Sequence, residues 1–507
     1  MRKLTGKLGK VFLISFVLCA LAYSVLITNE CTNVWDGLWA GSIDNGARWV
    51  LSIGRWFWPF ISWSRLRIST EPFTSLMTIA LIVFSGCLIL SMFSLTESRA
   101  AYFVPLVLGV NVTVCICLSY RFMSPTFGTA ILLNVLGIWL LKKKKQWWSW
   151  VLATGFFTLG LGCYQAYIGC ALVLFLACVI QMLLNREEKR TILIFALRTA
   201  AAILLACIVY KILWDVSLAI THIEPAKYRG ASSASIGNIL TRLPQRIIDA
   251  YTDFFAYFAG NSFTHHVFQK IFLYPAAVAA YALLSLIPVV RHFRVSKGGA
   301  VIMLVCFLCF PVAANVSLLL APEAGKTDVL MALPMVMMAP VLLCVCLRNK
   351  SRNRLLRWAP LLLISFFLYG GFLQCSIEQH TMLHGRESTI SFMDRVVANL
   401  EANDMIHSEN EIIFLGRPSG NPLFNKDDLW ELSNERSRYG NLPYNNDSCV
   451  MSYLAVARDG GYNLPLAEDS TVWHEIAARP ESRAMPVYPA EGYCQIIDGY
   501  LVVKLSK

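Results

Sequence analysis

The segment between the first two apolar stretches of this chain carries the side chains with the clearest chemical potential. Asp36 stands between Trp35 and Trp39, and two arginines, Arg48 and Arg55, follow it. A carboxylate in such an apolar setting would have a raised pKa, which would make it a better base. Arginine guanidiniums can hold a phosphate group through paired hydrogen bonds. The segment therefore combines a candidate base with a candidate phosphate clamp.

A helix over residues 44–58 would arrange these side chains on an amphipathic surface. Arg48 and Arg55 would then share one face of the helix, and Trp49 and Trp56 would also share a face, because the members of each pair are seven residues apart. Tryptophan and arginine are also favoured at membrane interfaces as simple anchors. Composition alone leaves both interpretations of the helix open.

The composition is that of a membrane protein with many spans. The chain has 507 residues, of which 56% are hydrophobic and only 15% are charged. Windows of about 20 apolar residues are long enough to cross the hydrocarbon core as helices, and they lack the alternation of a β-barrel. We expect eleven spans, at 11–29, 73–93, 101–120, 126–141, 147–163, 167–185, 191–212, 271–290, 298–319, 329–347 and 358–376.

Basic residues in the short loops predict the orientation. One set of loops is rich in Lys and Arg, notably "KKKK" at 142–145 and "RNKSRNRLLR" at 348–357, whereas the alternate loops carry one basic residue or none. The positive-inside rule assigns the basic set, and with it the N-terminus, to the cytoplasm. The first apolar segment is interpreted as an anchor, since it is too long for a cleaved signal.

The net charge of +12 does not indicate nucleic acid as a partner. Residues 377–507 carry a net charge of −8, so the remaining +20 belongs to residues 1–376, where most of it lies in the short loops. There it sets orientation in the bilayer. No basic helix or zinc-ligand spacing supports DNA binding.

Three segments on the predicted exterior side are too long to be turns. These are the loop 30–72, the loop 213–270 and the tail 377–507, which follows a transmembrane catalytic domain at 1–376. Apolar spacing predicts an interfacial helix near 236–258 in the second loop. In the tail, "ESTISFMDRVVANLEAND" predicts a helix, "EIIFLG" a strand, and "YCQIIDGYLVVKLS" a hairpin that turns at Asp-Gly. The tail is therefore expected to be a small α/β domain.

A base beside a phosphate clamp at the exterior surface suits one reaction: sugar transfer from a lipid phosphate to an acceptor hydroxyl. Metal ligation is not indicated. His265 and His266 are adjacent, so their side chains would point apart, and the CxxC of Cys306 and Cys309 lies within a span and has no second pair. We expect no cofactor. Two tail cysteines could form a disulfide if the tail is exterior, namely Cys449 and Cys494.

Three motifs carry a family resemblance. "WDGLW" with "ARWVLSIGRWFWPFI" in the first loop, "LGCYQAYIG" at 161–169 and "MPVYPAEGYCQIIDGYLVVKLS" at 485–506 occur in this order. Together they resemble the bacterial membrane glucosyltransferases that modify O-antigen, the serotype-converting type II family. The resemblance implies an all-α membrane glycosyltransferase of the GT-C fold class.

The resemblance also implies substrates and roles. The donor would be a polyprenyl-phosphate sugar, typically glucose, the acceptor a surface glycan, and the reaction would invert the anomeric carbon. By position, Asp36 is the candidate base. A second acidic role is open between Asp44 and Glu30, because many relatives carry a Glu nearer the Arg-Trp segment, where this chain has Ala47 and Arg48. Further candidates for binding sugar or phosphate are Arg48, Arg55, Trp56, Tyr164, Gln165 and Lys326.

Two other functions fit a chain of this kind. A transporter or flippase of lipid-linked sugars would carry polar groups within its spans, and these spans carry almost none. A glycan polymerase or ligase would use one long exterior loop midway along the chain, for which 213–270 is available. Lys227 and Arg229 in that loop could meet an acidic acceptor, or could simply be solvated.

Overall fold

The structure is a computed structural model of the chain. It describes residues 2–32, 43, 47–227, 236–259, 272–320, 325–348, 353–406, 410–425, 437 and 450–507. The chain divides into two compact units, the first formed by Met1–Ser24 with Asp44–Cys375 and the second by Val25–Ile43 with Ser376–Lys507.

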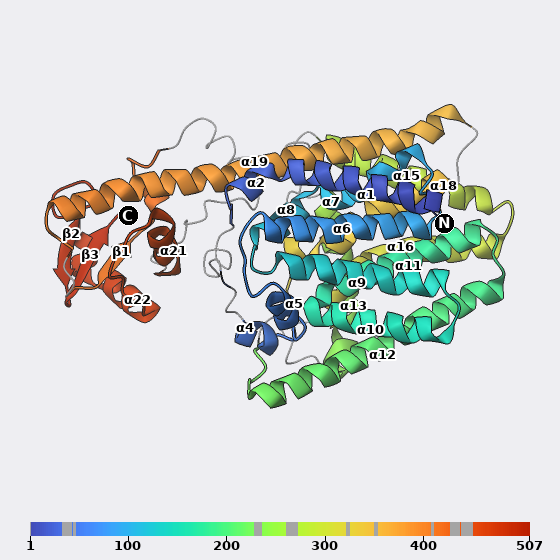
Figure 1. Cartoon of the computed structure of the whole chain (residues 1–507), viewed down its shortest axis with the longest axis horizontal. Coiled ribbons are helices and arrows are strands. Elements are labelled where there is room, and N and C mark those ends of the chain that lie inside the picture. The colour runs from blue at the N-terminus through green and yellow to red at the C-terminus, as the bar shows by residue number, and fades with distance from the viewer. Residues whose placement is uncertain are drawn as a thin grey trace. The chain divides into compact units, whose positions relative to one another are not determined.

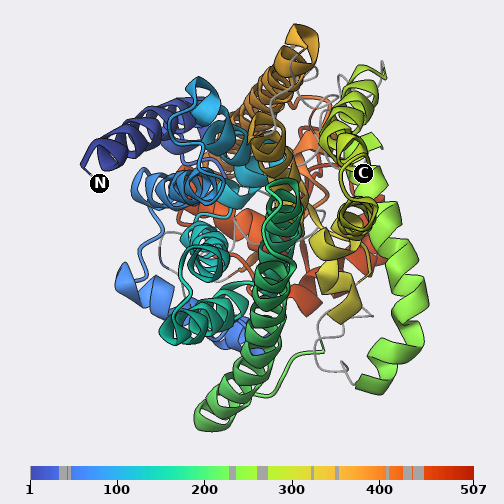
Figure 2. The ribbon, with the colours of Figure 1, turned by 90° about the vertical axis from the view of Figure 1, so that its right-hand side faces the viewer.

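The first unit is a bundle of helices, seen from the side in Figure 1 and with several helices nearly end-on in Figure 2. The long helices are α1 (Arg2–Ala22), α6 (Phe73–Met92), α9 (Ser124–Lys143), α10 (Trp147–Cys163), α11 (Ile168–Leu184), α12 (Lys189–Thr221), α13 (Ile236–Ala259), α15 (Leu273–His292), α16 (Lys297–Ala314), α18 (Leu333–Arg348) and α19 (Arg354–Ala402), whose residues from Ser376 on belong to the second unit. The shorter elements are α4 (Ala47–Ser52), α5 (Trp58–Ser64), η1 (Arg99–Tyr102), α7 (Phe103–Gly109), α8 (Val112–Ser119), η2 (Gln165–Tyr167), α17 (Val316–Leu320) and η3 (Val329–Met331).

Among the described residues, eight helices are long and apolar enough to cross a membrane, or nine if α7 and α8 with η1 count as one broken span. The protein is thus a helical membrane protein. Inner and outer helices differ in burial. In the segment Val329–Arg348, which contains α18, 78% of the apolar stretch is buried inside the protein, whereas in α12 only 22% of the apolar stretch is buried. Apolar side chains exposed along α12, such as Leu197 and Leu204, are suited to contact with lipid. The count of eleven spans stays a prediction, since α1 and α10, which correspond to two of the predicted spans, are not among these eight helices.

The prediction of one continuous helix over 101–120 is wrong, because the segment is broken into α7 and α8, which meet at a 50° bend. Tyr23, which follows α1, reaches the break and donates a hydrogen bond to Gly109 O at 2.8 Å. Its hydroxyl also accepts one from Asn111 N at 3.2 Å. The Asn111 side chain accepts from Val114 N and caps α8. The Tyr23 hydroxyl and the Asn111 side chain thus satisfy backbone groups that the break would leave unpaired in lipid.

Two helices run further than the sequence predicted. α12 continues past residue 212 to Thr221, where His222 ends it in the left-handed conformation. α19 joins the predicted last span and the predicted tail helix into one helix of 49 residues. No proline follows Pro360 within α19, so nothing in that stretch forces a break. The helix predicted near 236–258 is confirmed as α13.

The second unit has a three-stranded sheet ordered β1–β3–β2, from β1 (Ile412–Leu415), β2 (Cys494–Ile497) and β3 (Tyr500–Lys504). β1 is parallel and β2 antiparallel to β3. Asp498 and Gly499 have φ of 52° and 85°, as a type I′ hairpin turn requires. The predicted strand, hairpin and mixed α/β character are confirmed. The other elements of the unit are α2 (Ser24–Thr28), whose first residue belongs to the first unit, η4 (Pro418–Gly420), α21 (Val450–Gly460), α22 (Ser470–Ala478) and α23 (Pro480–Ala484).

The core of the second unit joins the end of α19 to the sheet. Met393 and Leu400 are fully buried there, beside Val502 and Trp473. Met393 and Leu400 both lie in the segment for which the sequence predicted the tail helix. Cys494 lies on β2, whereas Cys449 lies outside the described residues, so their proposed disulfide stays a prediction.

Candidate functional site

The Arg-Trp segment of the first loop folds as two short helices joined by a turn. The helix predicted over 44–58 is wrong beyond Ser52, where α4 ends. Gly54 has a φ of +87°, a conformation that ordinary side chains rarely adopt. Residues 44–46 lie outside the described residues.

This break separates side chains that a continuous helix would have aligned. Arg48 is exposed on α4, whereas Arg55 is half-buried in the turn. The two tryptophans also part: Trp49 is 50% exposed and Trp56 only 7%. The predicted common face for each pair is therefore wrong, and the turn at Gly54 is the physical reason.

Two side chains bind the carbonyls of the turn itself. Gln165 Nε2 donates to Ile53 O at 2.9 Å, and Tyr210 Oη of α12 donates to Gly54 O at 3.1 Å. Gln165 also donates to Tyr210 Oη, at 2.9 Å. A Cβ at Gly54 would collide with the Tyr210 hydroxyl and lie 2.7 Å from Gln165 Nε2. Close approach of these partners therefore requires glycine at position 54.

Further contacts fix both ends of the turn. Trp214, one helical turn beyond Tyr210 on α12, donates from Nε1 to Leu51 O at 2.9 Å. At the other end Phe57 N donates to Gly162 O at 2.9 Å. A Cβ at Gly162 would lie 2.8 Å from the indole of Trp56, so a larger side chain there would displace Trp56. Thus two motifs that lie more than a hundred residues apart pack together.

Arg55 lies against aromatic rings in this assembly. Its guanidinium carbon is 4.8 Å from the ring centre of Tyr164 and 5.8 Å from that of Trp58. Both distances fit cation–π contacts. Arg55 Nε is buried and has no hydrogen-bond partner among the residues that the structure describes. A buried, unpaired N–H of a cation is a place where an anion would be stabilised.

The structure brings four of the predicted site residues together: Arg55, Trp56, Tyr164 and Gln165. Asp36 and Asp44 lie outside the described residues, as do Arg229, His265 and His266. The alternative acid Glu30 belongs to the second unit. There it lines a cavity of about 370 Å³ with Arg386 and Glu387. The roles assigned to all these residues stay predictions.

Lys326 lies in a separate network. Its side chain is exposed, and the next residue, Thr327, donates its backbone N–H to Asp253 Oδ2 at 2.6 Å. Thr327 Oγ1 also donates to Asn315 Oδ1, at 3.1 Å. Asp253 comes from α13 and is 6% exposed. This buried carboxylate thus holds the loop that presents Lys326. Within the described part of the chain, the hydrogen bonds given for this loop are with Asp253 and Asn315, not with residues of the Arg55 turn.

The sequence did not single out three residues of these arrangements, Tyr210, Trp214 and Asp253, nor the separate carboxylate Glu71. Spacing could have found the first pair, because they lie four apart at the predicted exterior end of a span. Glu71, just before α6, accepts from Ser75 N at 3.1 Å, from Ser75 Oγ at 2.8 Å and from Thr74 Oγ1 at 2.7 Å. Burial raises the pKa of Glu71, although the Thr74 and Ser75 hydrogen bonds oppose the rise.

The fold and this site are those of a helical membrane protein that carries a half-buried arginine in a turn at one end of its bundle. A family model described as glucosyl transferase GtrII matches residues 40–345. Because the match covers more than half of the chain, the protein belongs to the glucosyl transferase GtrII family and is a glucosyltransferase. The resemblance inferred from the motifs is thereby confirmed.

The family match includes the Arg55 turn and the "LGCYQAYIG" motif. It begins after Asp36 and ends before the tail, so it does not test either the candidate base or the C-terminal likeness. No curated protein matched the chain, and no solved structure matched it.

Proposed function

We propose that the protein transfers glucose from a polyprenyl-phosphate donor to a surface glycan, such as O-antigen, at the exterior face of the bacterial plasma membrane. The observation that carries this proposal is Arg55, a guanidinium fixed on aromatic rings with a buried Nε left unpaired in the described residues. Such a cation would stabilise the charge that develops on a leaving phosphate. We also propose that the protein has a GT-C fold, a cytoplasmic N-terminus and an exterior tail.

In the proposed reaction Asp36 takes the proton of the acceptor hydroxyl. The acceptor oxygen then bonds to the anomeric carbon on the face opposite the phosphate, and the bond between that carbon and the phosphate oxygen breaks. The phosphate oxygen keeps the electron pair. Because the acceptor attacks from the opposite face, the configuration at the anomeric carbon inverts. No oxidant, reductant or cofactor enters this balance.

The other residues of the turn would orient the donor. Gln165 binds the carbonyl of Ile53 and so fixes the backbone that carries Arg55. Trp56 and Tyr164 are nearly buried, so they would act on the donor by holding the turn and Arg55 in place. Arg48 and Lys326, both exposed, would meet the phosphate from outside. Asp44 is kept as a second acidic residue. Preorganisation of this kind lowers the cost of charge development in the transition state.

The enzyme family favours this proposal over a transporter or flippase. The polymerase and ligase alternative is less well supported, because Arg55 and the two rings that contact it, Trp58 and Tyr164, lie outside the 213–270 loop. Trp214 and Ala226 of that loop donate hydrogen bonds to carbonyls of α4. The first long loop, rather than the middle one, thus contributes the arginine.

Reconstitution tests the proposal directly. Full-length protein in vesicles is given radiolabelled polyprenyl-phosphate glucose and a lipid-linked glycan, with and without EDTA. We expect label to appear in the glycan with inverted anomeric configuration, in both conditions. Arg55→Ala should raise the donor KM, whereas exposed Arg190→Ala serves as the control. No transfer from any polyprenyl-phosphate sugar would refute the proposed donor.

A further inference from the structure

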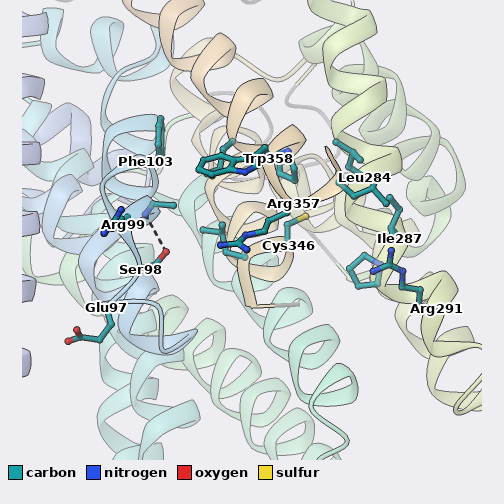
Figure 3. A pocket seen from close by; sticks show the side chains of 16 residues that line it. Glu97, Ser98, Arg99, Phe103, Leu284, Ile287, Arg291, Cys346, Arg357 and Trp358 are labelled. Carbon is teal, nitrogen blue, oxygen red and sulfur yellow. Dashed lines mark hydrogen bonds between the residues drawn. The ribbon is translucent and has the colours of Figure 1, made fainter. Parts of the chain in front are cut away.

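A cavity of about 510 Å³ opens in the first unit among the loops that charge distribution assigns to the cytoplasm. It is formed by the start of η1, the last turns of α15 and α18 and the first turns of α19. Figure 3 shows the lining side chains reaching it from these separate helices. The cavity shares none of its lining residues with the Arg55 turn, so it is a separate site.

Three arginines surround this cavity: Arg99, Arg291 and Arg357. Each comes from a different element, and in the view of Figure 3 Arg357 lies between the other two. The lining carboxylate is Glu97, and it is paired with Lys7 of α1. The local charge is therefore strongly positive and suits an anion.

The rest of the lining is apolar. It includes Phe103, Leu284, Ile287, Leu361 and the indole of Trp358, which is 57% exposed. A free phosphate would leave this surface uncovered. A ligand with an anionic head and hydrocarbon chains would satisfy both parts, since apolar area removed from water stabilises binding. The same combination of interfacial Trp and Arg anchors membrane proteins to lipid headgroups.

We propose that this cavity binds one anionic phospholipid of the cytoplasmic leaflet. The headgroup phosphate is held at Arg357, with Arg99 and Arg291 on either side raising the local positive charge, and an acyl chain lies along Leu284 and Ile287. Arg guanidiniums bind phosphate oxygens through paired donors. A bound lipid would link α15, α18 and α19 to η1, and so would stabilise the bundle at the end opposite the Arg55 turn. This proposal does not rest on the proposed glucosyl donor.

Native mass spectrometry of the detergent-purified full chain tests the proposal. Phosphatidylglycerol and phosphatidylcholine are titrated against the wild type, against Arg99→Gln/Arg291→Gln/Arg357→Gln, and against Arg190→Gln/Arg294→Gln/Arg354→Gln. The control triple removes the same charge from exposed arginines that do not line the cavity. We expect the wild type and the control to prefer phosphatidylglycerol and the cavity triple to lose that preference roughly tenfold or more.

Two results would overturn the proposal. Equal loss in both triple variants would show general surface charge rather than a site. Competition by inorganic phosphate at low millimolar concentration would show an anion site that does not use the apolar wall. If the cavity triple fails to fold, Ile287→Trp, which fills the apolar part, replaces it. That variant should lower phosphatidylglycerol binding, and unchanged binding would count against the proposed position of the acyl chain.

Discussion

The guanidinium of Arg55 lies over the ring of Tyr164, 4.8 Å from its centre. This contact joins the first long loop to the short connection between α10 and α11, which the sequence marks as two separate motifs. It also explains how an arginine is held in an apolar place without a described carboxylate partner. The ring face supplies negative potential, yet leaves the N–H groups directed elsewhere.

Replacing Tyr164 tests whether this contact positions Arg55. Tyr164→Ala removes the ring, and a cation–π contact of about 1 kcal/mol corresponds to a roughly fivefold rise in donor KM. Tyr164→Phe keeps the ring face and should remain near wild type. Steady-state kinetics with the polyprenyl-phosphate donor distinguish the two variants. Equal effects of Ala and Phe would point to the hydroxyl instead of the ring.

The turn at Gly54 gives a stability prediction. Gly54→Ala introduces a Cβ at positive φ and against Tyr210 and Gln165, so it should destabilise the protein by about 1–3 kcal/mol. Gly155→Ala in α10 is the matched control, because no atom lies within 4 Å of its added Cβ. Thermal unfolding in detergent measures both. A Gly54→Ala variant as stable as the Gly155→Ala variant would contradict the described turn.

Asp253 is predicted to hold the loop that carries Lys326. Asp253→Leu would leave the Thr327 amide unpaired, at a cost of about 1–3 kcal/mol, whereas Asp253→Asn retains an acceptor oxygen. Hydrogen exchange at residues 325–328 should therefore quicken in the Leu variant much more than in the Asn variant. Unchanged exchange in both variants would remove Asp253 from this role.

Glu71 gives a pH dependence with a defined sign. Burial raises its pKa in the folded state above the ordinary value of 4.5. Protonation therefore favours the folded state, so the contribution is fully present below pH 4.5 and is lost as pH rises through the raised value. Thermal unfolding of wild type and Glu71→Gln should diverge over this window, with the wild type losing more stability as pH rises. Parallel profiles would contradict the raised pKa.

The sequence predicts the parts of this protein that depend on local pattern. Apolar periodicity predicts α13, and the Asp-Gly dipeptide predicts the tail hairpin, because each depends on neighbouring residues. The bend at Gly109–Asn111 depends on Tyr23, far away in the chain, so local pattern does not reveal it. The common face predicted for Arg48 and Arg55 is absent for a related reason. The chain turns at Gly54, between the two arginines, and the partners of this turn come from η2 and α12.

The candidate site divides in the same way. Arg55, Tyr164 and Gln165 could be singled out in the sequence, because of their residue types and because they lie in the family motifs. Their mutual arrangement required the fold, as did the contributions of Tyr210 and Trp214. The buried acceptor Asp253 resembles any other loop-side acid in the sequence, and only its contact with Thr327 distinguishes it.

The central claim is that Asp36 is the base, and glucosyl transfer by Asp36→Asn tests it most directly. The variant is compared with Asp44→Asn in the same vesicles, with donor binding measured separately. We predict that Asp36→Asn loses transfer by at least roughly 100-fold, as expected for loss of a general base, while donor binding stays close to wild type. Transfer at the wild-type rate by Asp36→Asn, or a comparable loss confined to Asp44→Asn, would contradict the claim.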